Sequence, residues 1–244
     1  MTIDFSKAYT IFIKYWPLFF AGLKSTVLFA IVGTLVGLVI GLVIGGLRAL
    51  EVTEWDSVVS KVVKRIVKVI TGLYVWVFRG TPMMCQAVFL YYLLKPLLGW
   101  TSFVAGLCII SINTGAYMAE IIRAGIQSVD KGQTEASKAI GMSTTQTLLY
   151  IIFPQAIKNS FPSIGNQLIV NIKDSSMLNC IAVTELFFYS TSVAGTNMRY
   201  IETFLVSLII YLILTTIATF LLNFIESRMN DGETKRGESI EFCS

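Results

Sequence analysis

The chain has 244 residues, of which 55% are hydrophobic and 14% are charged, with a formal net charge of +4. A soluble domain carries about a quarter charged residues, so this composition indicates a protein whose apolar surface faces lipid. Histidine is absent, which excludes imidazole metal sites and Ser-His-Asp catalysis. The four cysteines form no CxxC pair, and no GxxxxGK[ST] motif is present. Neither a zinc site nor a nucleotide-binding P-loop is therefore expected.

Five stretches are predicted to cross a membrane. A helix needs about 20 mainly apolar residues to span a hydrocarbon core of about 30 Å. Residues 25–47, 102–119 and 203–225 qualify clearly. Residues 83–94 are too few alone but are lengthened by the preceding turn, and residues 160–189 are weakly apolar. The predicted fold class is an all-α integral membrane protein with about five transmembrane helices.

The distribution of basic residues predicts the orientation. An odd number of spans places the termini on opposite sides, and an outer N-terminus puts most lysines and arginines on the inner side, as the positive-inside rule requires. No removable signal peptide is expected. The predicted organisation is an N-terminal periplasmic or interfacial segment over residues 1–20, a transmembrane domain over 21–228, and a frayed cytoplasmic tail over 229–244.

A strip of glycines marks the first span. Gly33, Gly37, Gly41 and Gly45 stand four residues apart and lie on one helix face, where a neighbouring backbone can approach closely. Packing within this chain and contact with a second copy both explain the strip, and the first is favoured.

Residues 58–69 form a basic segment. Lys61, Lys64, Arg65 and Lys68 recur at helical spacing between valines and isoleucines. Two interpretations remain open. The segment is either a helix on the cytoplasmic membrane surface that anionic lipid binds, or the charged cytoplasmic end of the second span. Neither makes a nucleic-acid site.

The loop between the third and fourth spans predicts two short helices. Asp130 and Gln133 have the spacing of a capping pair, and Gly141 is suited to the left-handed residue that ends a helix. Ser143 and Gln146 repeat the capping pattern and begin a second helix, which is expected to stop or kink at Pro154. The first helix is predicted over residues 130–141.

One face of this first helix is built of small residues. Ala136, Ala139 and Ile140 share it at spacing i, i+3, i+4, which makes a knob suited to a groove on another protein. A solvent-exposed helix of this length is marginal alone. A docked partner is therefore expected.

The same loop resembles a known signature. Glu135-Ala136-Ser137, three residues, Gly141, nine residues and the run IIFP at 151–154 are similar to the EAA signature, EAA-x3-G-x9-I-x-LP, of the membrane subunits of ABC importers. The chain departs from it at Ser137 and Phe153. The resemblance implies that residues 130–141 are the coupling helix and that this loop, including Glu135 and Pro154, fits a cleft on a separate ATPase subunit.

The resemblance extends to the polar amino acid branch of that family. It is carried by the runs FRGTP (78–82), NTGAYMAEIIR (113–123), PQA (154–156), GNQ (165–167), KDSS (173–176) and VTEL (183–186). It implies a type I importer, MetI-like architecture. It also implies a second permease subunit, identical or homologous, an extracytoplasmic solute-binding protein and a cytoplasmic ATPase dimer that uses the ATP and Mg; this chain binds no cofactor itself.

Ionisable groups at membrane depth need a partner or a water-filled path. Glu120 and Arg123 have the i, i+3 spacing of a local ion pair, and we expect a structural role for both. Arg79 lies in the turn that Pro82 closes and is expected to anchor that turn. The alternative is that Arg79 balances the negative charge of the acidic residues in the fourth span. Lys173 receives no assignment.

A polar stripe marks the fourth span. Ser163, Gln167, Asn171 and Asp174 line one helix face, which indicates either a solute pathway or hydrogen bonding between helices. Ser175, Ser176 and Glu185 add hydroxyl and carboxylate oxygens that suit an ammonium or guanidinium group. The candidate pathway residues are therefore Gln167, Asn171, Asp174, Ser175, Ser176 and Glu185.

The expected function is the permease subunit of an ABC importer that carries a polar amino acid across the bacterial inner membrane by alternating access. An ion-coupled secondary amino acid transporter is the alternative, although no internal repeat of the kind common there is evident. An enzyme is not expected, because neither a metal-ligand cluster nor a nucleophile-base pair stands out.

Overall fold

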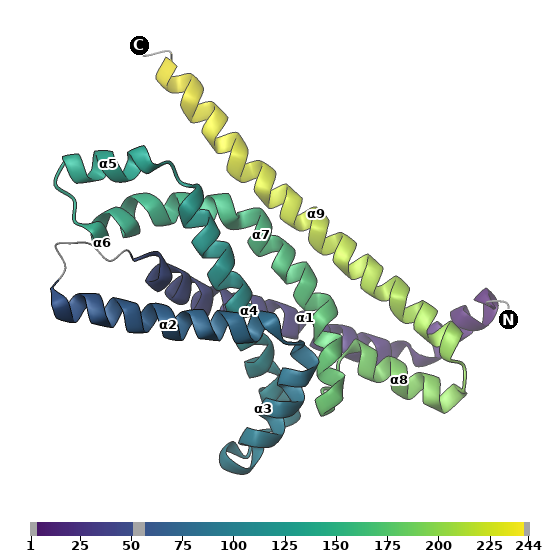
Figure 1. Cartoon of the computed structure of the whole chain (residues 1–244). Helices are drawn as coiled ribbons and strands as arrows, with labels where there is room; N and C mark the ends of the chain where they lie inside the picture. The colour runs from purple at the N-terminus through teal and green to yellow at the C-terminus, as the bar shows by residue number, and fades with distance from the viewer. Residues whose placement is uncertain (1–3, 51–56, 242–244) are drawn as a thin grey trace.

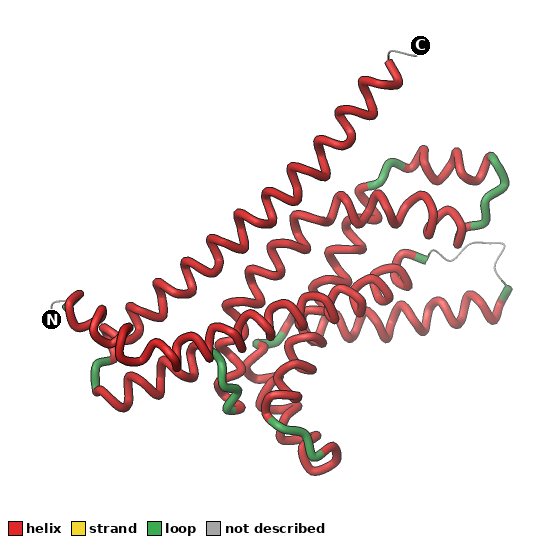
Figure 2. Tube along the Cα trace, turned by 180° about the vertical axis from the view of Figure 1, so that it is seen from behind, coloured by secondary structure: helices red, strands yellow, loops and turns green. Residues whose placement is uncertain are grey.

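The computed structural model describes residues 4–50 and 57–241, with side chains through residue 229. This part of the chain is a bundle of helices (Figures 1 and 2). In chain order its elements are α1 (Phe5–Ala49), α2 (Val58–Gly80), α3 (Met83–Leu98), α4 (Ser102–Ser128), α5 (Lys131–Ala139), α6 (Thr144–Gln146), the π-helical segment η1 (Thr147–Ile152), α7 (Phe153–Asp174), the 3-10 segment η2 (Ser175–Ile181), α8 (Leu186–Asn197) and α9 (Tyr200–Glu241).

The glycine strip packs α1 against α4 at the centre of the bundle. A Cβ added at Gly33 would lie 3.0 Å from Ile110, and one added at Gly37 would lie 2.6 Å from Thr114. At Gly41 the added atom would overlap Met118. The favoured explanation is confirmed, because the strip lets two helices of the same chain approach closely.

Three of the described helices are long and apolar enough to cross a membrane by length and composition, namely α1, α4 and α9. They contain the three clear predicted spans. The predicted second span lies in α3, which has 16 residues, fewer than the roughly 20 that a crossing needs. A full helix, α2, precedes α3; the sequence indicated a helical segment only over residues 58–69, followed by a turn.

The expected fourth span is a broken element. The stretch Thr144–Ile181 and the helix Leu186–Asn197 are together long and apolar enough to cross a membrane, but the two are bent by 57° at the break between them. Ala182, at φ 60°, ends the 3-10 segment, and the Glu185 carboxylate accepts the backbone N–H groups of Phe187 and Phe188 at 2.9 and 2.7 Å. This cap begins α8 in a new direction.

The sequence predicts a stop or a kink at Pro154, and the stop is wrong, because the chain stays helical through Pro154. Thr147–Ile152 winds as a π-helix, in which the N–H of Phe153 bonds to the carbonyl of Leu148. Pro154 therefore falls in the first turn of α7, where its missing N–H leaves no bond unmade.

The described segments near both ends of the chain are helical. α1 runs unbroken from residue 5 through residue 20, with Pro17 inside it, so residues 5–20 are continuous with the first span. α9 continues to Glu241, through most of the region predicted to fray. The basic segment is the first half of α2, whose buried residues, Thr71 and Val75, belong to its second half.

Candidate functional site

The predicted coupling helix is α5, at the end of the bundle opposite α8 (Figure 1). Asp130 caps it by accepting the N–H of Gly132 at 2.7 Å. At the other end, the N–H groups of Gly141 and Met142 bond back to the carbonyls of Lys138 and Ser137, and Gly141 has φ +84°. This Schellman arrangement confirms both predicted ends of the helix.

The small-residue face of α5 is exposed. Ala136 and Ala139 are exposed, and the Ile140 side chain is 79% exposed. Ser137, which replaces the second alanine of the signature, is 4% exposed and donates its hydroxyl to the carbonyl of Gln133 at 2.6 Å. The substitution therefore lies on the inner side of α5 and leaves the outer face unchanged.

A small apolar cluster fixes α5 to the bundle. Val129, between α4 and α5, is buried with Ile152 and Ala156. The capping box predicted for the next helix is confirmed, since Ser143 accepts the N–H of Gln146 and the Gln146 side chain accepts the N–H of Ser143. Val129 therefore packs the start of α5 against the end of η1 and the first turn of α7.

Glu120 is the centre of a charge cluster that joins three helices. Arg123 Nε donates to Glu120 Oε1 at 3.0 Å, which confirms the expected local ion pair. Arg48 Nη1, at the end of α1, donates to Glu120 Oε2 at 3.1 Å, and Arg79 Nη1, at the end of α2, lies 3.9 Å from the same oxygen. The carboxylate therefore ties α1 and α2 to α4.

Sequence reasoning pairs Glu120 with Arg123 but misses Arg48 and Arg79. A usable signal exists, because the charge-free runs of the first and third spans end at Arg48 and at Glu120 on the same predicted side. Two such residues at one depth are candidates for an ion pair between helices.

The turn between α2 and α3 is anchored by an amide. Gln86 Nε2 donates to the carbonyls of Phe78 and Thr81 at 3.0 and 2.9 Å, and its Oε1 accepts from Asn113 Nδ2 at 2.8 Å. Pro82 caps α3. Arg79 faces Glu120, so it balances an acid other than those of the fourth span.

Two members of the polar stripe form a buried network. Asn171 Oδ1 accepts from Thr114 Oγ1 at 2.9 Å and from Gln167 Nε2 at 3.3 Å. Asn171 Nδ2 donates to Thr34 Oγ1 at 2.8 Å. The network links α1, α4 and α7 directly, whereas Ser163, at the start of the stripe, is exposed.

The other candidate pathway residues lie where α7 ends. Asp174 is partly exposed at the last position of α7, while Ser175 and Ser176 donate their hydroxyls to the carbonyls of Ile172 and Lys173. Glu185 is fully buried, caps α8 and accepts the Tyr211 hydroxyl at 2.9 Å. Its carboxylate is already satisfied by three donors in this conformation.

A bundle of apolar helices with an exposed, capped helix at one end and buried polar side chains within is consistent with the permease subunit of a transporter. The chain belongs to the family of binding-protein-dependent transport system inner membrane components, whose family model matches residues 37–231. It is of the polar amino acid type of ABC importer permease, as its relatives show.

The glutamine transport system permease protein GlnP of Escherichia coli is 38% identical over 160 residues, which cover 64% of this chain and 73% of the relative. The arginine transport system permease protein ArtQ of Bacillus subtilis is 34% identical over 166 residues, 67% of this chain and 76% of the relative. A crystal structure of an amino acid ABC transporter with histidines matches with a TM-score of 0.78 and 34% identity, covering 93% of this chain and all of that one.

Proposed function

We propose that this permease takes up a polar amino acid by alternating access, powered by a cytoplasmic ATPase dimer that docks on α5. The observation that carries the proposal is the exposed face of Ala136, Ala139 and Ile140 on a helix capped at both ends. A short helix in water is marginal by itself, so a docked partner accounts for an apolar face kept outward. Glu135 also lies on the exposed side of α5.

The connections of α5 support its role as a transmitter. Asp130 follows Val129 directly, so α5 joins α4 through two capping residues with no flexible linker. On its other side α5 packs on η1, which runs into α7. Because α4 and α7 carry the Thr114, Gln167 and Asn171 network, movement of α5 is expected to change the packing of these helices and to open opposite sides in turn.

The remaining assembly is proposed from the family. It comprises a second permease subunit, identical or homologous, and an extracytoplasmic solute-binding protein. The N-terminus lies outside and the C-terminus in the cytoplasm, in a bacterial inner membrane whose lipid contacts the apolar faces of α1 and α9. ATP and Mg are used by the ATPase, and this chain binds no cofactor and no nucleic acid.

The amino acid is proposed to pass Gln167, Asn171 and Asp174 and the serines that follow. The relatives named for glutamine and arginine transport make these two amino acids the first probes. Uptake of radiolabelled L-glutamine and L-arginine into proteoliposomes containing the permease, the ATPase and the solute-binding protein tests the proposal. Uptake must require ATP on the side of the membrane where the ATPase lies. It must also persist when ionophores collapse the ion gradients.

The docking role has its own test. Ala136→Arg places a long charged side chain on the exposed face of α5, so we expect loss of ATPase co-purification with normal membrane insertion. Thr196→Arg is the matched control, since Thr196 is exposed on α8, at the other end of the bundle (Figure 2). Equal recovery of the ATPase with both variants contradicts docking on α5. Uptake driven by an ion gradient without ATP contradicts the importer.

A further inference from the structure

The first half of α2 carries cations that the proposed transport cycle does not use. Four of them lie within eight consecutive positions, at Lys61, Lys64, Arg65 and Lys68. Arg65 and Lys68 are exposed, and within residues 4–50 and 57–229 the structure gives neither of them an ion pair with an acid. Acidic side chains of the described ranges therefore do not balance these two charges.

An apolar face borders these cations. Its exposed residues follow the spacing i, i+4, i+7, i+11 and i+14 of one helix face, at Val62, Ile66, Val69, Leu73 and Trp76. The buried residues of α2, Thr71 and Val75, lie on the opposite side of the helix. The apolar face is therefore turned away from this chain's own bundle, and Arg65 lies at its edge.

A contact among three helices gives the depth of α2 in the membrane. A Cβ added at Gly115 of α4 would lie 2.6 Å from Ile40 of α1 and 2.8 Å from the Tyr74 hydroxyl of α2. The charge-free run of α1 lies between Lys24 and Arg48, and its middle is four residues before Ile40. The contact is therefore about 6 Å from the bilayer centre, on the proposed inner side.

The cations of α2 lie farther toward that side. α2 lies beside α1 and begins at the end of the bundle that carries α5 (Figure 1). Counted back from Tyr74 at about 1.5 Å per residue, Lys68 is about 15 Å and Arg65 about 20 Å from the centre. The hydrocarbon ends about 15 Å from the centre, and the headgroups end at about 20–22 Å. Both cations therefore lie at the level of the inner headgroups.

We propose that Arg65 and Lys68 bind the phosphate of an anionic phospholipid of the inner leaflet, whose acyl chains lie along Val69 and Leu73. A guanidinium group can donate two parallel hydrogen bonds to a phosphate, and a lysine adds a point charge. Lys64 and Lys61 extend the positive field toward the cytoplasm. The proposal rests on the orientation proposed above, and it is independent of the solute and of the ATPase.

The apolar border favours a lipid over a soluble acidic partner. A soluble protein would satisfy the cations at the headgroup level, but it could not cover Val69, Leu73 and Trp76, which lie within the hydrocarbon. A phospholipid supplies a phosphate at the upper level and acyl chains at the lower one. A zwitterionic phospholipid carries its own cation, so a lipid of net negative charge is the better match.

The test measures the lipid preference of the full chain. Binding of phosphatidylglycerol and of phosphatidylcholine, offered in equal amounts in detergent, is followed by native mass spectrometry. The double variant Arg65→Gln with Lys68→Gln is expected to lower the preference for phosphatidylglycerol about 5-fold to 25-fold, from about 1 kcal/mol for each cation near an anionic surface. Excess inorganic phosphate is expected to leave the lipid bound, because phosphate brings no acyl chains.

The matched control removes two charges from the other end of the bundle. Lys14→Gln with Lys95→Gln changes two exposed lysines and lowers the net charge equally, so we expect it to keep the preference. An unchanged preference in the α2 variant, or an equal loss in the control, overturns the proposal, as does displacement of the lipid by inorganic phosphate. If the α2 variant does not fold, the wild-type chain still decides. Its preference must fall between about 50 and 500 mM ammonium acetate, because salt screens exposed charges, and a constant preference overturns the proposal.

A second permease subunit on the same face predicts a different result. A nitroxide attached at Val69→Cys in the assembled transporter in liposomes, compared with the parent protein, is expected to collide with oxygen and to be protected from a water-soluble nickel chelate. Protection from oxygen, or broadening by a second nitroxide, would place another subunit on this face and overturn the lipid site.

The lipid site and the importer fail separately. An unchanged lipid preference in the α2 variant overturns the lipid site and leaves ATP-dependent uptake standing. Absence of ATP-dependent uptake by the wild-type complex overturns the importer, whereas the lipid preference is measured without solute or ATPase.

Discussion

The contact between α1 and α4 is close enough that one methyl group should disturb it. At Gly41 an added Cβ would overlap the Met118 side chain and would lie 2.7 Å from the carbonyl carbon of Met118 and 2.9 Å from the nitrogen of Ala119. Backbone atoms cannot turn aside, so the helices must separate. Overpacking of this kind costs about 1–3 kcal/mol, and the higher helix propensity of alanine returns about 0.5–1 kcal/mol.

Gly72→Ala is the matched control, because a Cβ added at Gly72, in α2, would meet nothing within 4 Å. The propensity gain is common to both variants, so their difference in stability isolates the packing cost, which we expect to be about 1–3 kcal/mol. Unfolding in mixed micelles, followed by tryptophan fluorescence at rising SDS fractions, measures this difference. Equal stability of Gly41→Ala and Gly72→Ala would refute the close approach of α1 and α4.

Three further substitutions test the other structural assignments. Glu120→Gln removes the carboxylate shared by three guanidinium groups and should lower stability by about 1–3 kcal/mol. Glu202→Gln removes a carboxylate that pairs, among the described residues, with the one guanidinium of Arg199, and should change stability by less than about 1 kcal/mol; equal losses in the SDS titration would argue against the charge cluster. Gly141→Ala forces a side chain into the left-handed region at the end of α5 and should cost about 1–2 kcal/mol and weaken ATPase binding in a pull-down, with Gly195→Ala unaffected; undiminished binding would contradict the capped geometry. Glu185→Gln weakens the cap of α8 and should lower thermal stability by about 1–2 kcal/mol, with uptake of glutamine and arginine reduced alike; a change in selectivity at unchanged stability would instead assign Glu185 to the solute.

Structural features that depend only on residues within about one helical turn could be predicted from the sequence. The ends of α5 follow from Asp130 and Gly141, and the capping box follows from Ser143 and Gln146, because these residues act on backbone groups one turn away. The long apolar runs likewise predict α1, α4 and α9. The period of four in the glycines predicts a close contact, although it does not by itself identify α4 as the neighbour.

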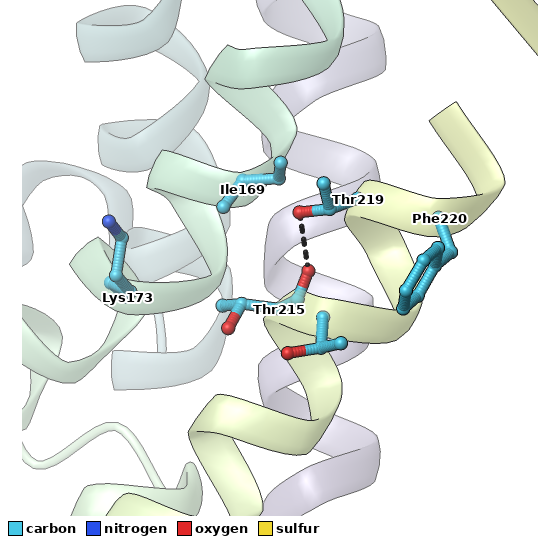
Figure 3. Close-up of a pocket in the computed structure, with 6 residues that line it drawn as sticks. Ile169, Lys173, Thr215, Thr219 and Phe220 are labelled. Carbon is cyan, nitrogen blue, oxygen red and sulfur yellow. Dashed lines mark hydrogen bonds between the residues drawn. The ribbon is translucent and has the colours of Figure 1, made fainter. Parts of the chain in front are cut away.

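Features that depend on tertiary contacts could not be predicted. The carboxylate of Glu120 meets Arg79 only because the end of α2 converges on α4, and the sequence gives no signal for that contact comparable to the matching depth of Arg48. The π-helical segment before Pro154 shifts the hydrogen-bond register, so the proline is accommodated where the local pattern predicts a kink. Lys173 lines one hollow with the threonines of α9 (Figure 3), which are more than 40 positions away in the sequence.

The most direct test of α5 as the docking helix is labelling of Ile140→Cys with a membrane-impermeant maleimide, compared with the parent protein because native cysteines also react. The account predicts labelling in inside-out vesicles, no labelling in right-side-out vesicles, and protection when the ATPase is bound. Labelling from the outer side, or equal labelling with and without the ATPase, would contradict it.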